Sequence, residues 1–170
     1  MSDPTEPVFR EPAFPGPAPA SPESPFQGAT PQAAVSGEPE SPAAVSPLPL
    51  IIVDGANVVG SVPDGWWRDR AGAAVRLRDS LAPVAAAGLA GVPGPVEVVL
   101  VVEGKARDIP QGPPGVRVER APGSGDDKII DLVRGERRPR QIVVVTADRG
   151  LRDRALALDA EVRGPSAVPR

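Results

Sequence analysis

Apolar residues form short, almost uninterrupted runs in the last two thirds of the chain. Three such runs lie at Leu50–Val53, Val96–Val102 and Ile142–Val145. A run of this kind is typical of a strand in a parallel sheet that is covered on both faces. Val116–Arg120 alternates between apolar and polar residues, as a half-buried or edge strand does. A last short strand is expected at Glu161–Arg163.

The segments between these runs have helical spacing. One helix is expected over Arg68–Leu89, and Pro83 should kink or split it near Ala82, because proline lacks a backbone donor. Another is expected from about Ser124 to Arg134, with Ser124 as its N-cap. A third helix is marked by Leu151, Ala155 and Leu158. Strands and helices alternate, which predicts an α/β fold with a mostly parallel sheet and helices on both faces.

Composition divides the chain near residue 49. Of the 24 prolines, 13 lie in residues 1–49, and the same segment carries six acidic residues against one basic residue. Such a sequence cannot bury enough apolar surface to offset the entropy of an ordered chain. We therefore expect a disordered tail at 1–48 and one folded domain at 49–170.

Charge and residue content exclude several classes of function. The net charge is −3 for the whole chain, whereas residues 50–170 carry 18 basic and 16 acidic side chains, a balance that neither requires nor excludes a nucleic-acid partner. The chain has no Cys and no His, which excludes disulfides, Cys/His zinc sites and catalysis by a Cys nucleophile or a Ser-His-Asp triad. Without a signal-peptide pattern or an apolar run near the roughly 20 residues that span a bilayer, we expect a cytoplasmic protein without a membrane partner.

Acidic residues follow the predicted strands at positions that topology can bring together. Asp54 and Asp148 each come after a buried strand, and Asp126 or Asp127 opens a helix. Parallel strands present their carboxyl ends at one edge of the sheet, where ligands of open α/β sheets bind. Clustered carboxylates repel one another unless a cation or a proton intervenes, and Mg²⁺ or Mn²⁺ suits a set of oxygen ligands. Asn57 could bind a phosphate or hold Asp54 in place.

Each of these residues also has a purely structural interpretation. Asp126 and Asp127 would complement a helix dipole, and Asp148 would serve as an N-cap. Asp54 could belong to a simple turn. Further acidic candidates are Glu103, which ends the second predicted strand, and Asp131, which lies one helical turn after Asp127. The combination at sheet-end positions favours a site over these separate alternatives.

Three segments, taken in order, resemble the NYN domains of the PIN-like nuclease superfamily, and most closely their YacP-like bacterial branch. The segments are DGANVVG, SGDDKIIDLV and VVVTADRGLRDR, and the resemblance covers about residues 50–165. It implies a Rossmann-like fold and a metal-dependent ribonuclease site. Asp54 would be the strand-end ligand and Asn57 the Asn of the DGxN turn. Asp127, alone or with Asp126, would be the middle acid and Asp148 the last.

The resulting expectation is an endoribonuclease that uses Mg²⁺ or Mn²⁺ and hydrolyses single-stranded or structured RNA. Its phosphates would be held by Arg68, Arg137, Arg138, Arg140 and Arg149. The alternative is a module that binds RNA or a ribosomal surface without turnover. A haloacid-dehalogenase-like phosphatase, whose first strand also ends in Asp, is disfavoured because it needs a second Asp where this chain has Ala56.

Overall fold

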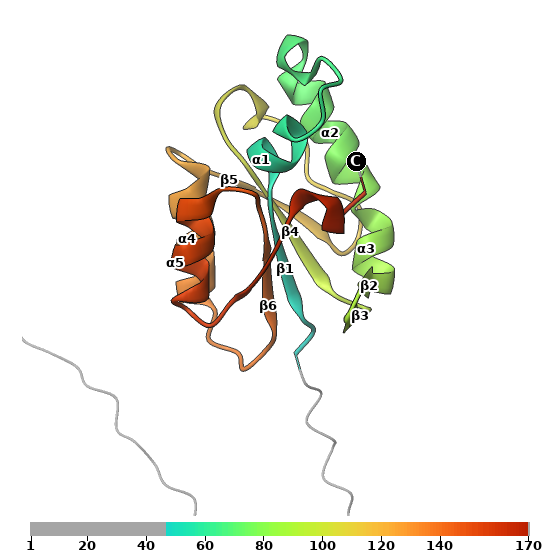
Figure 1. The fold of residues 1–170 in the computed structure, drawn as a ribbon. Helices are drawn as coiled ribbons and strands as arrows, with labels where there is room; N and C mark the ends of the chain where they lie inside the picture. Colours follow the sequence, from blue (N-terminus) through green and yellow to red (C-terminus); the bar gives the residue numbers. More distant parts are fainter. Residues whose placement is uncertain (1–46, 170) are drawn as a thin grey trace, which may run out of the picture. The chain divides into compact units, whose positions relative to one another are not determined.

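The computed structural model describes residues 47–169, which form an α/β domain (Figure 1). The disordered tail predicted at 1–48 lies outside these residues, apart from its last two positions. Five parallel strands make the central sheet in the order β5-β4-β1-β6-β7. Their bounds are β1 Leu50–Asp54, β4 Glu97–Val102, β5 Val116–Arg120, β6 Ile142–Val145 and β7 Glu161–Arg163. The predicted α/β class, the parallel sheet and all five strands are confirmed.

The strand order of the sheet changes direction at β1. After β1 it adds β4 and β5 on one side, then crosses back to add β6 and β7 on the other. Ligands in open α/β sheets bind outside the carboxyl ends of the strands at such a switch point. In the register, Val53 lies opposite Val145, so Asp54 and Thr146 are the next residues of two neighbouring strands.

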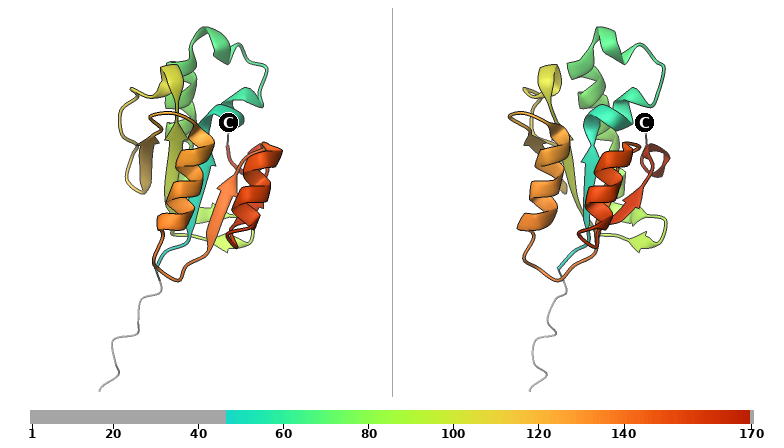
Figure 2. Two further views of the ribbon diagram at one scale, coloured as in Figure 1. Left: turned by 90° about the vertical axis from the view of Figure 1, so that its left-hand side faces the viewer. Right: turned by 60° about the vertical axis from the view of Figure 1, so that its left-hand side comes forward.

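Helices cover both faces of the sheet (Figure 2). One apolar core joins the sheet to α2, α3 and the C-terminal Val168, and the other joins it to α4 and α5, which lie side by side. The bounds are α2 Arg70–Ser80, α3 Ala82–Ala87, α4 Gly125–Gly135 and α5 Arg149–Leu156. The predicted split of the first long helix is confirmed, because α2 ends before Leu81 and Pro83 lies in the first turn of α3.

Several short elements were missed by the sequence patterns. The segment after Asp54, read as a tight turn, is a six-residue helix, α1 Gly55–Gly60, and Asp54 caps it by accepting from the Asn57 backbone N–H. The other short elements are the hairpin strands β2 Gly88–Leu89 and β3 Val92–Pro93 and the 3₁₀ helices η1 Trp66–Arg68, η2 Gly104–Ala106 and η3 Pro165–Ala167. Elements of two to six residues are too short to give a periodic pattern. No helix within residues 47–169 is long and apolar enough to cross a membrane.

Candidate active site

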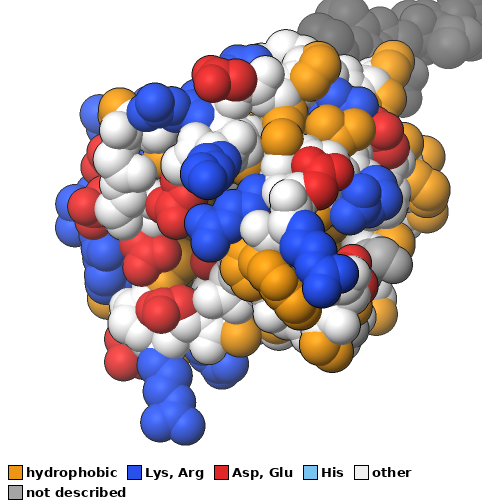
Figure 3. Space-filling model, turned by 90° about the horizontal axis from the view of Figure 1, so that it is seen from above, with side chains coloured by type: hydrophobic (Ala, Val, Ile, Leu, Met, Phe, Trp, Pro, Cys, Tyr) orange, Lys and Arg blue, Asp and Glu red, His pale blue; other side chains and the backbone are white. Residues whose placement is uncertain are grey.

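A hollow of about 480 Å³ opens at the carboxyl edge of the sheet. Four carboxylates line it, and they come from the ends of β1 and β4, the start of α4 and the start of α5: Asp54, Glu103, Asp126 and Asp148. Asn57 and Trp66 line the same hollow, which we call the acidic pocket. Figure 3 looks onto this edge and shows acidic side chains grouped together, with Lys and Arg side chains around them.

Asp54 is the most buried of these acids, at 7 % exposure. Both of its oxygens accept hydrogen bonds: Oδ1 accepts from the Asn57 backbone N–H at 3.1 Å, and Oδ2 accepts from the Thr146 hydroxyl at 2.9 Å. Burial raises the pKa of Asp54, the two hydrogen bonds oppose that rise, and the charges of Asp126 and Glu103 add to it. Asp54 therefore caps a helix and also contributes charge to a crowded anionic pocket.

Thr146 is a member of the site that the sequence analysis did not identify. It is fully buried, and its hydroxyl donates to Asp54 while accepting from the backbone N–H of Asp148 at 3.0 Å. A hydroxyl provides one donor and two acceptor positions, so it can join both groups. The available signal was a hydroxyl residue placed between a buried strand and an acid, in the segment VVVTAD.

Asn57 and Asp148 fix the loop that follows β6. The side-chain oxygen of Asn57 accepts from the backbone N–H of Ala147 at 3.0 Å, which ties α1 to this loop. Asp148 caps α5, because its Oδ1 accepts from the Leu151 backbone N–H at 2.7 Å. The structural interpretation of Asp148 is thus correct, and the same side chain also lines the acidic pocket.

Glu103 connects β4 to the start of α4. Its Oε2 accepts from the backbone N–H of Gly125 at 2.5 Å. Gly125 is buried, and a Cβ added there would lie 3.0 Å from that oxygen, so glycine permits the close approach. This contact holds the first turn of α4 against the pocket.

The structure separates the two adjacent acids of α4. Asp126 lines the acidic pocket, and its carboxylate accepts no hydrogen bond from the described residues. Burial raises its pKa, as do the nearby charges of Asp148, Glu103 and Asp127, while Arg154 opposes them. Asp127 points elsewhere: it is 69 % exposed and pairs with Arg154 at 2.7 Å. The pocket thus contains Asp126, whereas the resemblance had indicated Asp127 first.

Four further predicted residues lie far from this pocket. Asp131, Arg138 and Arg140 line a different hollow, near the amino ends of the strands. Arg140 is 2 % exposed there, and it pairs with Glu136 and with Glu97 at the start of β4. Arg137 is exposed in the same connection between α4 and β6. These arginines lie at the edge of the sheet opposite the acidic pocket.

Two other predicted arginines stay at the carboxyl edge. Arg149 is exposed and begins α5 directly after Asp148. Arg68 ends η1, two residues after Trp66, and its guanidinium lies 6.0 Å from the centroid of the Trp67 ring. Within residues 47–169, no three acidic side chains lie close enough together to hold one metal ion in this arrangement.

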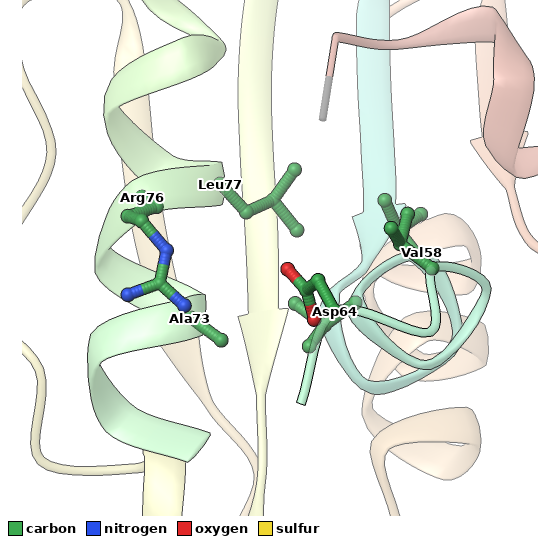
Figure 4. A pocket seen from close by; sticks show the side chains of 7 residues that line it. Val58, Asp64, Ala73, Arg76 and Leu77 are labelled. Atoms are coloured by element: carbon green, nitrogen blue, oxygen red, sulfur yellow. The ribbon is translucent and has the colours of Figure 1, made fainter. Parts of the chain in front are cut away.

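A separate hollow of about 280 Å³ lies between α1, the loop that follows it and α2 (Figure 4). Val58 and Leu77 give it apolar walls, and Asp64 and Arg76 are its charged residues. Asp64 accepts from the Trp66 backbone N–H at 3.0 Å, so its carboxylate already has a structural role. None of the predicted site residues lines this hollow.

Comparison with known proteins gives a likeness in structure alone. No protein-family model matches the chain. No curated protein sequence matches it either. The crystal structure of Rae1 (YacP) from Bacillus subtilis superposes with a TM-score of 0.55 at 20% sequence identity, over 69% of this chain and 70% of that one. A point mutant of the same protein gives a TM-score of 0.53 at 18% identity, over 71% and 72%. The described domain therefore has the fold of Rae1 (YacP), and the expected YacP-like fold is confirmed.

Proposed function

We propose that this chain is a metal-dependent ribonuclease that hydrolyses phosphodiester bonds of RNA at the acidic pocket. The observation that carries the proposal is the convergence of Asp54, Glu103, Asp126 and Asp148 on one hollow at the switch point of the sheet. The sequence motifs that contain three of these acids resemble a nuclease family, and the fold agrees with a YacP-like domain.

The composition of the pocket fits a hard divalent cation. Its ligands would all be oxygen atoms, since the chain has neither His nor Cys. Burial and mutual repulsion raise the pKa values of Asp54 and Asp126, and a bound cation would relieve that repulsion. Mg²⁺ commonly binds through one or two carboxylates together with waters and substrate phosphates, so three converging carboxylates are not required. Asp126 and Asp148 are the proposed ligands, with Asp54 and Glu103 beside them.

The chain's own residues would position the substrate and keep the acids in place. A bound Mg²⁺ or Mn²⁺ would activate water and stabilise charge on the phosphoryl group. Thr146 holds Asp54 and the backbone of Asp148 in fixed relation. The Asn57 side-chain oxygen is engaged by Ala147, which leaves its amide N–H groups as donors toward a phosphate oxygen. Arg149, exposed beside Asp148, would attract the RNA backbone.

A cleavage assay with two adjacent variants tests the proposal. The full chain is incubated with end-labelled RNA in Mn²⁺ or in EDTA, and Asp126→Asn is compared with Asp127→Asn. Wild type should cleave only with Mn²⁺. The cleavage rate of Asp126→Asn should fall by more than about 10- to 100-fold, which is the usual loss when only a hydrogen-bond partner of a metal ligand is removed. The cleavage rate of Asp127→Asn should stay within a few-fold of wild type, because Asp127 pairs with Arg154 outside the pocket.

The alternative function is an RNA- or ribosome-binding module without turnover. It would give RNA binding by the full chain with no cleavage in Mn²⁺ or Mg²⁺. The engaged oxygens of Asp54 and Asp148 are compatible with it, since both carboxylates already accept structural hydrogen bonds. A chain that neither binds nor cleaves RNA would overturn both functions.

A further inference from the structure

A hollow of about 270 Å³ adjoins the acidic pocket on the side of β4 and α2. The two share Ala56, Trp66 and Glu103, so they lie next to each other at the end of β4. We call it the Trp66 hollow. Its volume lies just below the roughly 300 Å³ at which pockets for drug-sized ligands begin. It therefore has room for one small group beside the acidic pocket.

The walls of the Trp66 hollow combine aromatic, aliphatic and cationic groups. Trp66 is half-buried, and Val59, Ala74 and Val102 supply aliphatic surface. The side chains of Arg70 and Lys105 also line the hollow, and both residues are exposed to solvent. The Arg70 guanidinium lies 5.3 Å from the centroid of the Trp66 ring. An aromatic ring with cations beside it is the combination that proteins use to bind unpaired nucleotides.

We propose that the Trp66 hollow binds an unpaired nucleobase of a single-stranded RNA, next to the phosphate held at the acidic pocket. The inference rests on the proposed action on RNA and adds the class of substrate. The base would contact the Trp66 ring, and Arg70 and Lys105 would neutralise the adjoining phosphates. These cations offset the repulsion that the four carboxylates of the acidic pocket exert on a polyanion.

The hollow discriminates against a continuous duplex. In a duplex both faces of each base are stacked and its edge is paired, so a base reaches a protein pocket only after it is unstacked and flipped out. A single strand, a loop or a bulge presents such a base without that penalty. The enzyme should therefore act on unpaired segments and disfavour duplex RNA.

The two tryptophans, the only ones in the chain, make the test direct. Trp67→Phe leaves Trp66 as the only tryptophan, and Trp66→Leu leaves Trp67, which is 54 % exposed and lines neither hollow. Each full-length variant is titrated in Ca²⁺ with a short single-stranded RNA and with its duplex, and tryptophan emission and affinity are measured. Circular dichroism melting verifies folding, and Trp66→Phe replaces Trp66→Leu should the latter not fold.

The single strand should quench the emission of Trp66 in Trp67→Phe. It should leave the emission of Trp67 in Trp66→Leu nearly unchanged. Trp66→Leu should weaken binding by about 5- to 150-fold, the range that follows from the loss of one base stacked on an aromatic ring. Equal quenching of both tryptophans, or equal affinity of Trp66→Leu and wild type, would overturn the base site while leaving the cleavage proposal intact. Trp66 quenching without cleavage by wild type would support the base site and contradict the nuclease. No RNA binding by wild type would overturn both.

Discussion

The buried hydroxyl of Thr146 donates a hydrogen bond to Asp54 Oδ2 over 2.9 Å. The Thr146 hydroxyl oxygen also accepts from the backbone N–H of Asp148 at 3.0 Å. Parallel pairing of β1 with β6 in the register Val53 to Val145 brings the two strand ends together. One side chain thus joins two acids of the candidate site that are far apart in the sequence.

Thr146→Val tests this connection. Valine has a similar shape but no hydroxyl, so Asp54 Oδ2 loses a hydrogen-bond donor and the backbone N–H of Asp148 loses its acceptor. We expect a loss of about 1–3 kcal/mol in the free energy of unfolding, because buried polar groups are left unsatisfied. RNA cleavage should also fall, since both acids lose their fixed position. Urea unfolding and the cleavage assay measure the two effects.

Thr146→Ser is the matched control, because it keeps the hydroxyl and removes only a buried methyl group. Its free energy of unfolding should fall by about 0.8 kcal/mol, the value for one buried carbon, and its cleavage rate should stay within a few-fold of wild type. If serine and valine reduce cleavage equally, the hydroxyl does not position the acids.

Gly55→Ala tests the packing that places α1 over the sheet. A Cβ at Gly55 would lie 2.6 Å from the backbone oxygen of Val101 in β4, and backbone cannot move aside easily. We expect the free energy of unfolding to fall by about 1–3 kcal/mol, the usual range for overpacking. Gly60→Ala, at the other end of α1, would place its Cβ an ordinary 3.7 Å from Trp66 and should leave stability unchanged or slightly higher. Equal urea-unfolding midpoints for the two variants would contradict the close approach.

Glu136→Gln tests the ion pairs at the opposite edge of the sheet. Hydrogen bonds from Arg138, and then from Arg140, lower the pKa of Glu136 from 4.5 to about 2. A lowered pKa in the folded state stabilises the fold above pH 4.5, and this contribution is lost as the pH falls toward 2. The variant should therefore be less stable than wild type at pH 7, by about 1–3 kcal/mol. The gap should close between pH 4.5 and 2 in urea-unfolding series. A gap that stays constant over this range would show that ionisation of Glu136 does not stabilise the fold.

The strand-end acids were predictable because their positions depend on local patterns. A buried apolar run followed by Asp identifies Asp54 and Asp148 without knowledge of the fold. The choice between Asp126 and Asp127 was not accessible in this way. Adjacent residues of a helix point about 100° apart, since a turn contains 3.6 residues, and only packing of α4 on the sheet fixes which one faces the pocket.

The role of the arginine-rich connection between α4 and β6 could not be predicted from sequence patterns. A run of arginines reads as a phosphate-binding surface, but Arg140 is buried against Glu97, which is distant in sequence. Such an ion pair exists only after β4 and β6 have taken places on either side of β1. Thr146 was overlooked for a similar reason, since its acceptor, Asp54, belongs to another strand.

Asp126 gives the most direct test of the central claim that the acidic pocket binds a divalent cation. Its carboxylate lines the pocket without a structural hydrogen bond from the described residues, and burial together with neighbouring acids raises its pKa. Asp126→Asn removes a charge that the metal-free fold holds unfavourably, so the variant should be as stable as wild type in EDTA, or more stable.

The deciding measurement is thermal unfolding of wild type, Asp126→Asn and Asp127→Asn across a Mn²⁺ titration. A cation that binds only the folded state should stabilise wild type by about 2.7 kcal/mol at 100 times its dissociation constant. We expect the same response for Asp127→Asn, because the Asp127 side chain pairs with Arg154, and a much smaller response for Asp126→Asn. An Asp126→Asn variant that is destabilised in EDTA and responds to Mn²⁺ as wild type does would contradict cation binding at the acidic pocket.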